Sequence, residues 1–140
     1  MKKYVGTKHI EAEPMSMQKA YDNGLLQAGK TPIEGKEGYM VKYNDGYISW
    51  SPKEIFEAAY KVEETPLDRL YIERKELDEK FRKLCTFIGK KDFAEVIKDE
   101  EMRTLLRLQQ HYMGEYLSIL NVRIKMMVNE TETIENKEEN

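Results

Sequence analysis

The sequence predicts an α+β protein in which a small antiparallel β unit with short helices precedes a long antiparallel helical hairpin. Residues 39–43 and 47–50 are two β-rich runs joined by Asn44-Asp45-Gly46, and Asp-Gly suits the positive φ that a tight antiparallel turn requires. Apolar residues then recur at steps of three and four over two long segments, which is typical of packed helices. We therefore expect an α+β unit over residues 1–62, a helical hairpin over residues 65–128 and a disordered acidic tail over residues 129–140.

The N-terminal unit has further local signals. Residues 3–11 are a plausible strand, and Ser16 is a suitable cap for a short helix over residues 17–22 that Asn23-Gly24 would end. Three glycines and a proline make residues 29–38 a loop. Ser51-Pro52-Lys53-Glu54 has the pattern of a capping box, so a second short helix should run to about Tyr60.

The helical hairpin begins at a second capping pattern, Thr65-Pro66-Leu67-Asp68. We expect this helix to end near Ile88, before Gly89, and a short piece over residues 92–98 to lead into a helix over residues 99–127. The first helix has one apolar seam, and Arg74 interrupts it. The members of that seam are Leu67, Leu70, Leu77, Phe81, Leu84 and Ile88.

The second long helix carries two apolar seams rather than one. The first comprises Met102, Leu106, Gln109, Met113, Tyr116 and Leu120, and the other comprises Leu105, Leu108, Tyr112, Ile119, Val122 and Met126. A single helical partner can cover only one of them, and a helix that is apolar on two faces must bury the second elsewhere. We therefore expect a homo-oligomer, a dimer or larger, assembled through this hairpin.

Composition narrows the classes of function. No apolar run approaches the roughly 20 residues that span a bilayer, and no signal-peptide core follows the first lysines, so we expect a cytoplasmic protein with no membrane association. Cys85 is the only cysteine, which excludes an internal disulfide. Five glutamates and one lysine give residues 129–140 a charge of −4, so the other 128 residues total +1. That near-neutral body disfavours a non-specific nucleic-acid binder.

The sequence offers no catalytic constellation. Residues 24–31 match the phosphate-binding loop pattern G-x-x-x-x-G-K-[ST], but a helix rather than a strand is expected before them and Pro32 follows them, so we reject that interpretation. His9 and His111 lack cysteine or carboxylate neighbours at metal-ligand spacing. We expect a protein that is not an enzyme, with no cofactor and no metal.

Two arginines on the second long helix are candidates for ligand contact. Arg103 and Arg107 are four residues apart and share one helix face, with Gln110 one turn further on. Two guanidinium groups on one face can clamp a pyrophosphate. Alternatively, they pair with Glu100, Glu101 or glutamates of the tail and have only a structural role.

Three residues of the first long helix complete the candidate set. Arg74, at a seam position, should face a subunit boundary or bind an anion, because a buried guanidinium without a partner is costly. Phe81 and Phe87 could stack on a base, although aromatic residues at helical spacing more often belong to a core.

The order of the segments resembles the phage Thoeris anti-defence protein 1 family. The segments that carry the resemblance are Met1-Lys-Lys-Tyr-Val-Gly-Thr-Lys8, Ala12-Glu-Pro-Met15, Gly38-Tyr-Met-Val-Lys-Tyr43 and Gly46-Tyr-Ile-Ser-Trp-Ser-Pro-Lys-Glu54, followed by the helical hairpin. The hairpin is similar to the helical module of anti-CBASS 2 proteins. Its matching residues are Leu105-Leu106, Gln109, Met113, Tyr116, Leu120 and Arg123-Ile124.

The resemblance implies a phage anti-defence protein, a non-enzymatic sponge that binds a glycocyclic ADP-ribose immune signal and withholds it from its effector. Some relatives also hold cyclic oligonucleotides at a separate site. With this implication, Arg103 and Arg107 would hold the pyrophosphate, Phe81 or Phe87 would stack on the adenine, and Gln110 would contact a polar edge. Two other interpretations remain open: a phage structural or partner-binding oligomer, and a nucleic-acid-binding regulator.

Overall fold

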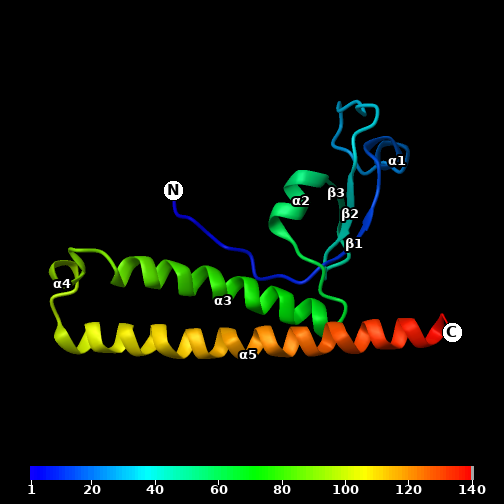
Figure 1. Ribbon diagram of the computed structural model, residues 1–140. Coiled ribbons are helices and arrows are strands. Elements are labelled where there is room, and N and C mark those ends of the chain that lie inside the picture. The colour runs from blue at the N-terminus through cyan, green and yellow to red at the C-terminus, as the bar shows by residue number, and fades with distance from the viewer. Residues whose placement is uncertain (140) are drawn as a thin grey trace. The chain divides into compact units, whose positions relative to one another are not determined.

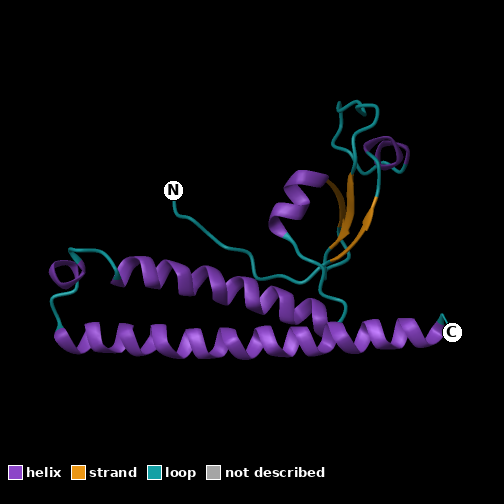
Figure 2. Cartoon of the chain, viewed as in Figure 1, coloured by secondary structure: helices purple, strands orange, loops and turns teal. Residues whose placement is uncertain are grey.

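The computed structural model describes residues 1–139, which form two compact units, Met1–Lys61 and the residues from Val62 onward. The first unit contains β1 (Glu11–Pro14), α1 (Met17–Asp22), β2 (Gly38–Lys42), β3 (Ile48–Pro52) and α2 (Lys53–Ala59). The second contains α3 (Pro66–Ile88), α4 (Phe93–Val96) and α5 (Glu100–Glu138) (Figures 1 and 2). The α+β class and the antiparallel sheet are therefore confirmed.

The three strands form one antiparallel sheet in the order β1-β2-β3. The strand predicted over residues 3–11 is wrong in position, because β1 begins only at Glu11. Glu11 pairs with Lys42, the last residue of β2, so residues 3–10 lie beyond the end of the partner strand. Pairing with β2, rather than local β propensity, determines where β1 lies.

The turn between β2 and β3 has the predicted residues. The amide of Gly46 donates to the Tyr43 carbonyl at 2.9 Å, and the amide of Tyr43 donates to the Tyr47 carbonyl at 2.8 Å. Gly46 has a φ of +88°, whereas Asp45 accepts a hydrogen bond from the Tyr47 amide at 3.0 Å. This arrangement is a three-residue hairpin loop with glycine at the left-handed position.

The helix α2 does not begin with the predicted capping box. Its N-cap is Pro52, which makes no side-chain capping bond, and Ser51 instead pairs with Tyr39 in the sheet. Because β3 continues through Pro52, Ser51 is still in extended backbone when the helix starts at Lys53. The helix ends at Ala59, with Tyr60 as its C-cap, close to the predicted end.

The core of the first unit is small and includes an aromatic hydrogen bond. Its fully or nearly buried residues are Met15, Met17, Ala20 and Val41. The indole Nε1 of Trp50 donates to the Met15 carbonyl at 2.7 Å. Glycine is required at Gly38, where an added Cβ would collide with the Ser51 carbonyl oxygen and would lie only 2.5 Å from the Trp50 ring.

The helix α3 begins and ends where the sequence predicts. Thr65 Oγ1 accepts from the Asp68 amide at 3.0 Å, and the Asp68 carboxylate accepts from the Thr65 amide at 3.1 Å, which together form a capping box. The short helix α4 then connects α3 to α5, whose N-cap Asp99 accepts from the amides of Glu101 and Met102. The predicted connecting piece and both long helices are present.

The helix α5 continues beyond the predicted end near residue 127. It remains helical to Glu138, where the sequence predicts a disordered tail, and Asn140 lies outside the described residues. Once a helix exists, each added residue gains a backbone hydrogen bond, and this segment contains neither glycine nor proline. At 1.5 Å per residue, α5 is about 58 Å long and α3 about 34 Å.

The helices α3 and α5 pack along one seam, but in a register that neither predicted seam describes fully. Leu70, Leu120 and Ile124 are buried together, and Leu106, Met113 and Leu117 of α5 are half-buried. Around these lie the partly buried residues Leu67, Leu77, Met127 and Val128. The inward positions of α5 thus follow 103, 106, 110, 113, 117, 120, 124 and 127, which is a heptad seam with two polar members.

Candidate functional site

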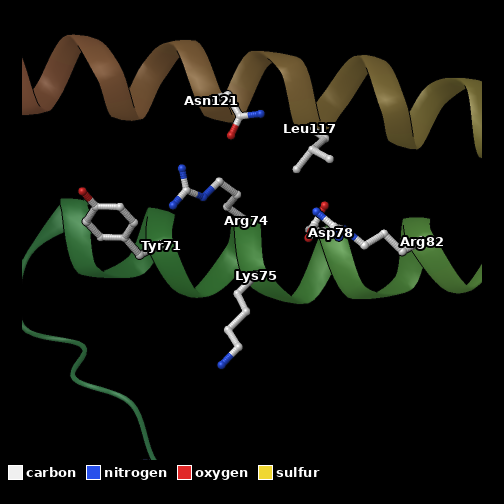
Figure 3. Close-up of a pocket in the computed structure, with 7 residues that line it drawn as sticks. All are labelled: Tyr71, Arg74, Lys75, Asp78, Arg82, Leu117 and Asn121. Carbon is white, nitrogen blue, oxygen red and sulfur yellow. Dashed lines mark ion pairs between the residues drawn. The ribbon is translucent and has the colours of Figure 1, made fainter.

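An open groove lies between the middle of α3 and the facing part of α5 (Figure 3). Its volume is about 540 Å³, within the range of small-molecule sites. The lining residues are Tyr71, Arg74, Lys75, Asp78 and Arg82 of α3 with Leu117 and Asn121 of α5. Three of these seven residues are cationic and one is acidic.

Arg74 is in the groove because of its place in the α3 seam. It lies four residues after Leu70 and three before Leu77, so helical geometry directs it toward α5. Its guanidinium extends toward Asn121, whereas the Lys75 ammonium points away from α5 (Figure 3). Arg74 is therefore half-buried in a seam whose neighbouring members, Leu70 and Leu77, are both leucines.

The charges of the groove are unevenly matched. Arg82 Nε lies 2.9 Å from Asp78 Oδ2, so the single acidic residue of the lining already has a partner. The Arg74 guanidinium lies 5.2 Å from the centroid of the Tyr71 ring, in cation–π contact. Among residues 1–139, no carboxylate lies within ion-pair distance of Arg74. The groove therefore holds an excess of positive charge centred on Arg74.

This arrangement suits an anionic ligand with a flat or apolar part. A guanidinium has five donors and binds phosphate in a bidentate manner. Leu117 offers an apolar contact and Asn121 an amide that can donate or accept. Tyr71 is 39% exposed and presents an aromatic ring next to the cation. These side chains can therefore bind a phosphate group and make an aromatic contact next to it.

At the other end of the hairpin, Arg103 contacts the backbone of its own chain. Its Nη1 donates to the Ile97 carbonyl at 2.7 Å and to the Lys98 carbonyl at 2.9 Å. These bonds hold the segment between α4 and α5 against the first turns of α5. One nitrogen of Arg103 is thus used within the fold, which leaves Nη2 and Nε for any ligand.

Arg107 lies over an aromatic pair that closes the same end. Its guanidinium is 5.5 Å from the centroid of the buried Phe93 ring. Phe87 meets Phe93 edge to face, with 5.3 Å between centroids. Phe87 therefore packs against another aromatic ring of the fold, as expected of an aromatic residue that belongs to a core. Arg107 remains exposed to solvent.

Gln110 and Phe81 lie at the interface of the two helices. Gln110 Nε2 donates to Cys85 Sγ at 3.2 Å. The Phe81 ring lies against Gly114, where an added Cβ would be 3.4 Å from two ring carbons. Both side chains are half-buried.

The six predicted residues therefore do not meet at one place. Arg74 lies in the groove, Arg103, Arg107 and Phe87 lie at the closed end, and Phe81 and Gln110 lie between them. Arg74 lies across from Asn121, which is 18 residues along α5 from Arg103, or about 27 Å. The other residues of the groove are not among those predicted from the sequence. The interrupted seam at Arg74 was a usable signal, because Tyr71 and Asp78 lie one helical turn to either side of it.

Other features of the described residues offer no competing site. A second hollow on α5 is lined by Asn129, Glu130, Thr133 and Ile134, with an acidic residue and no cation. Within residues 1–139, no group of histidine, cysteine or carboxylate side chains could hold a metal ion. None of the helices in this part of the chain is long and apolar enough to cross a bilayer.

Comparison with known proteins gives one match, and it falls on the helical hairpin. The model of a family described as Sequestin matches residues 64–126, a little under half of the chain. The matched segment contains the whole of α3 and α4, the first 27 residues of α5, the groove at Arg74 and all six predicted residues. Neither the curated proteins nor the solved structures gave a match. The hairpin is thus similar to a family whose name denotes sequestration.

Proposed function

We propose that this protein binds and sequesters a small phosphate-bearing nucleotide signal without degrading it, and that the groove at Arg74 holds the phosphate. The match to the Sequestin family over residues 64–126 supports binding and withholding as the activity. The groove lies within that matched segment, and its residues can bind but include no nucleophile paired with a base.

The observation that carries the proposal is the position of Arg74. Its guanidinium is half-buried between two helices, at a seam position where a leucine would pack, and it has no carboxylate partner in the described part of the chain. Such a cation reduces the stability of the hairpin unless an anion compensates it. A phosphate in the groove would supply that compensation, so ligand binding would also stabilise the hairpin.

The ligand that we propose is a glycocyclic ADP-ribose immune signal, and the role is that of a phage anti-defence sponge. The resemblance of the N-terminal segments to the phage Thoeris anti-defence family supports this choice. The ligand class has a pyrophosphate for Arg74 and an adenine for an aromatic ring such as Tyr71. Helices that are rigid before binding reduce the ordering cost of a tight complex.

The closed end of the hairpin is the second place where ligand contact is proposed. Arg107 is exposed, and Arg103 retains unused donors. Phe81 and Gln110 lie nearer the groove, because Phe81 is adjacent in sequence to Arg82 and Gln110 is seven residues before Leu117. Arg103 and Arg107, with Phe87 at the same end, are about 27 Å and about 21 Å along α5 from Asn121, too far to contact the cyclic mononucleotide that Arg74 would hold. A cyclic oligonucleotide at a separate site is the ligand we assign to them.

A depletion assay tests the proposal. The purified chain is mixed with glycocyclic ADP-ribose, the free ligand is measured by chromatography, and the protein is then heated to release what it holds. We expect depletion followed by recovery of intact ligand. Chemically altered ligand would identify an enzyme and refute sequestration. No depletion would leave the phage structural or partner-binding oligomer.

Variants locate the site. Arg74→Gln should abolish depletion, whereas Lys80→Gln, which removes the same charge from an exposed position of α3 outside the groove, should leave it unchanged. An Arg103→Ala/Arg107→Ala double variant should deplete this ligand normally and lose only cyclic oligonucleotide binding. If the double variant alone loses glycocyclic ADP-ribose, the assignment of the groove is wrong.

The nucleic-acid-binding regulator makes a different prediction. Such a protein would retain DNA or RNA on a filter at low salt and lose it steeply as the salt concentration rises. The sequestering protein should show no such retention, because its cationic groove is short and contains one unpaired guanidinium.

A further inference from the structure

Asp78 is the one acidic residue among the seven that line the groove, and its presence there requires an explanation. Its side chain is 34% exposed, and its Oδ2 lies 2.9 Å from Arg82 Nε. Figure 3 shows the carboxylate between Arg74 and Arg82, facing Leu117 of α5. A carboxylate so close to a bound phosphate repels it and reduces the affinity that Arg74 provides. A groove that only attracts anions would have a neutral or cationic side chain at this position.

The ion pair with Arg82 leaves part of the Asp78 carboxylate free. Arg82 Nε contacts Oδ2, whereas Oδ1 has no partner among residues 1–139. An ionised carboxylate accepts hydrogen bonds and cannot donate them, so the ligand group that it can bind is a donor such as a hydroxyl. In dinucleotide-binding proteins an acidic side chain binds a ribose hydroxyl in this way. A sugar hydroxyl is therefore the ligand group that matches Asp78.

The spacing of the groove residues along α3 gives the order of the ligand groups. Tyr71 lies three residues before Arg74, about 4.5 Å along the helix axis, and Asp78 lies four residues after it, about 6 Å. The groove thus presents an aromatic ring, a cation and a carboxylate in that order. In an ADP-ribose, the adenine and its ribose lie on one side of the pyrophosphate and a second ribose lies on the other. With the adenine at Tyr71 and the pyrophosphate at Arg74, the second ribose lies at Asp78.

We infer that Asp78 makes the groove selective for a pyrophosphate that carries a ribose on both sides. This inference rests on the proposed function of the groove and names the chemistry by which it recognises its ligand. A ligand whose pyrophosphate ends in a free phosphate, such as ADP or ATP, places that negative charge next to Asp78 instead of a hydroxyl. Repulsion then replaces a hydrogen bond. The groove can therefore hold its ligand in the presence of common nucleoside di- and triphosphates.

ADP and ADP-ribose are a matched pair of probes, because they differ only in the terminal ribose. Isothermal titration calorimetry on the full-length chain gives both dissociation constants, at fixed ionic strength and without divalent cations, which would neutralise ADP. We expect ADP-ribose to bind at least about tenfold more tightly than ADP, the difference that one hydrogen bond to a charged group can supply. Asp78→Ala should weaken ADP-ribose binding, strengthen ADP binding and so remove the preference.

Further variants separate the Asp78 carboxylate from the rest of α3. Glu79→Ala removes the same charge from an exposed position outside the groove and should leave the preference unchanged. Asp78→Asn keeps an acceptor oxygen without the charge, so ADP should bind more tightly while ADP-ribose changes little. Because Asp78→Ala also releases Arg82, it is repeated in an Arg82→Gln background, where it should again remove the preference. Circular dichroism checks that each variant is folded.

Opposite changes for the two probes are the result that supports the inference. A carboxylate that only stabilises α3 through its ion pair with Arg82 would change both affinities in the same direction or leave both unchanged, and either result overturns the inference. Equal affinity of the unaltered chain for the two probes, including no binding of either, also overturns it.

The depletion assay with glycocyclic ADP-ribose distinguishes this failure from a failure of the proposed function. A chain that depletes the cyclic ligand but does not distinguish ADP-ribose from ADP sequesters its ligand without the Asp78 contact, so the inference alone fails. A chain that does not deplete the cyclic ligand refutes sequestration, whatever its preference between the two probes.

Discussion

Replacing Gly114 by alanine should stabilise the hairpin, although this glycine lies where α3 and α5 approach each other closely. Gly114 is in the interior of α5, where glycine is less favourable than alanine by about 1 kcal/mol. The structure decides whether a methyl group fits. An added Cβ would lie 3.4 Å from two carbons of the Phe81 ring, which is the short end of ordinary van der Waals contact.

The expected gain is therefore close to the full propensity difference, reduced slightly by adjustment of the ring. For a unit of fewer than 100 residues, about 1 kcal/mol corresponds to a rise of about 4–8 °C in melting temperature. Thermal unfolding followed by the helical circular dichroism signal, at one fixed protein concentration, measures this shift. Gly114→Leu should have the opposite effect, because its outer carbons would have to displace Phe81.

A fall in melting temperature for Gly114→Ala would refute the reasoning. It would mean that the Phe81 ring cannot move by the small amount required, so that the two helices are closer at this position than the structure shows. A rise for Gly114→Leu would have a different meaning, namely that Phe81 does not cover Gly114 at all.

Three further changes test other parts of the structure. Asp68→Asn should lower stability at neutral pH, because hydrogen bonds from the Thr65 amide, and then the Glu64 amide, lower the pKa of this carboxyl in the folded protein. The ionised carboxylate therefore stabilises the fold at pH values above its unfolded pKa, and this stabilisation is lost as the pH falls through the lower folded pKa. The difference in stability between variant and parent, measured by urea unfolding, should vanish in acid. Gly38→Ala should destabilise the first unit by at least about 1–3 kcal/mol, because its Cβ would meet the Ser51 carbonyl; normal amide dispersion in the NMR spectrum would contradict this. In the final segment of α5, residues 129–138, amide hydrogen exchange should slow as salt is raised, since salt screens the repulsion among its glutamates; salt-independent exchange would show that this repulsion is not significant.

Local signals in the sequence were sufficient for several elements. The helix over residues 17–22 and the helix ending at Ile88 are at the predicted positions, because their caps are Ser16 and Thr65 with side chains that bond the backbone nearby. The hairpin turn is also local, since its geometry depends on Gly46 and its neighbours. Such features depend on only a few consecutive residues.

Features that depend on pairing between distant segments were not predictable in the same way. Ser51 has the composition of a helix cap, but its pairing with Tyr39 keeps it in the sheet. The true seam of α5 includes Leu117 and Ile124, and two alternating apolar patterns on one helix cannot indicate which of them α3 covers. The groove has the same origin, because Arg74 becomes part of a site only when Leu117 and Asn121 face it.

Trp50, whose indole donates a hydrogen bond to the Met15 carbonyl, is an intrinsic fluorescent probe of the first unit. Trp50 is the only tryptophan of the chain, and it belongs to the unit Met1–Lys61. Its emission wavelength should follow the loss of structure around that indole alone, whereas ellipticity is dominated by α3 and α5. Comparing the two signals in one denaturant titration would show whether the two units unfold together or in separate steps, without any label.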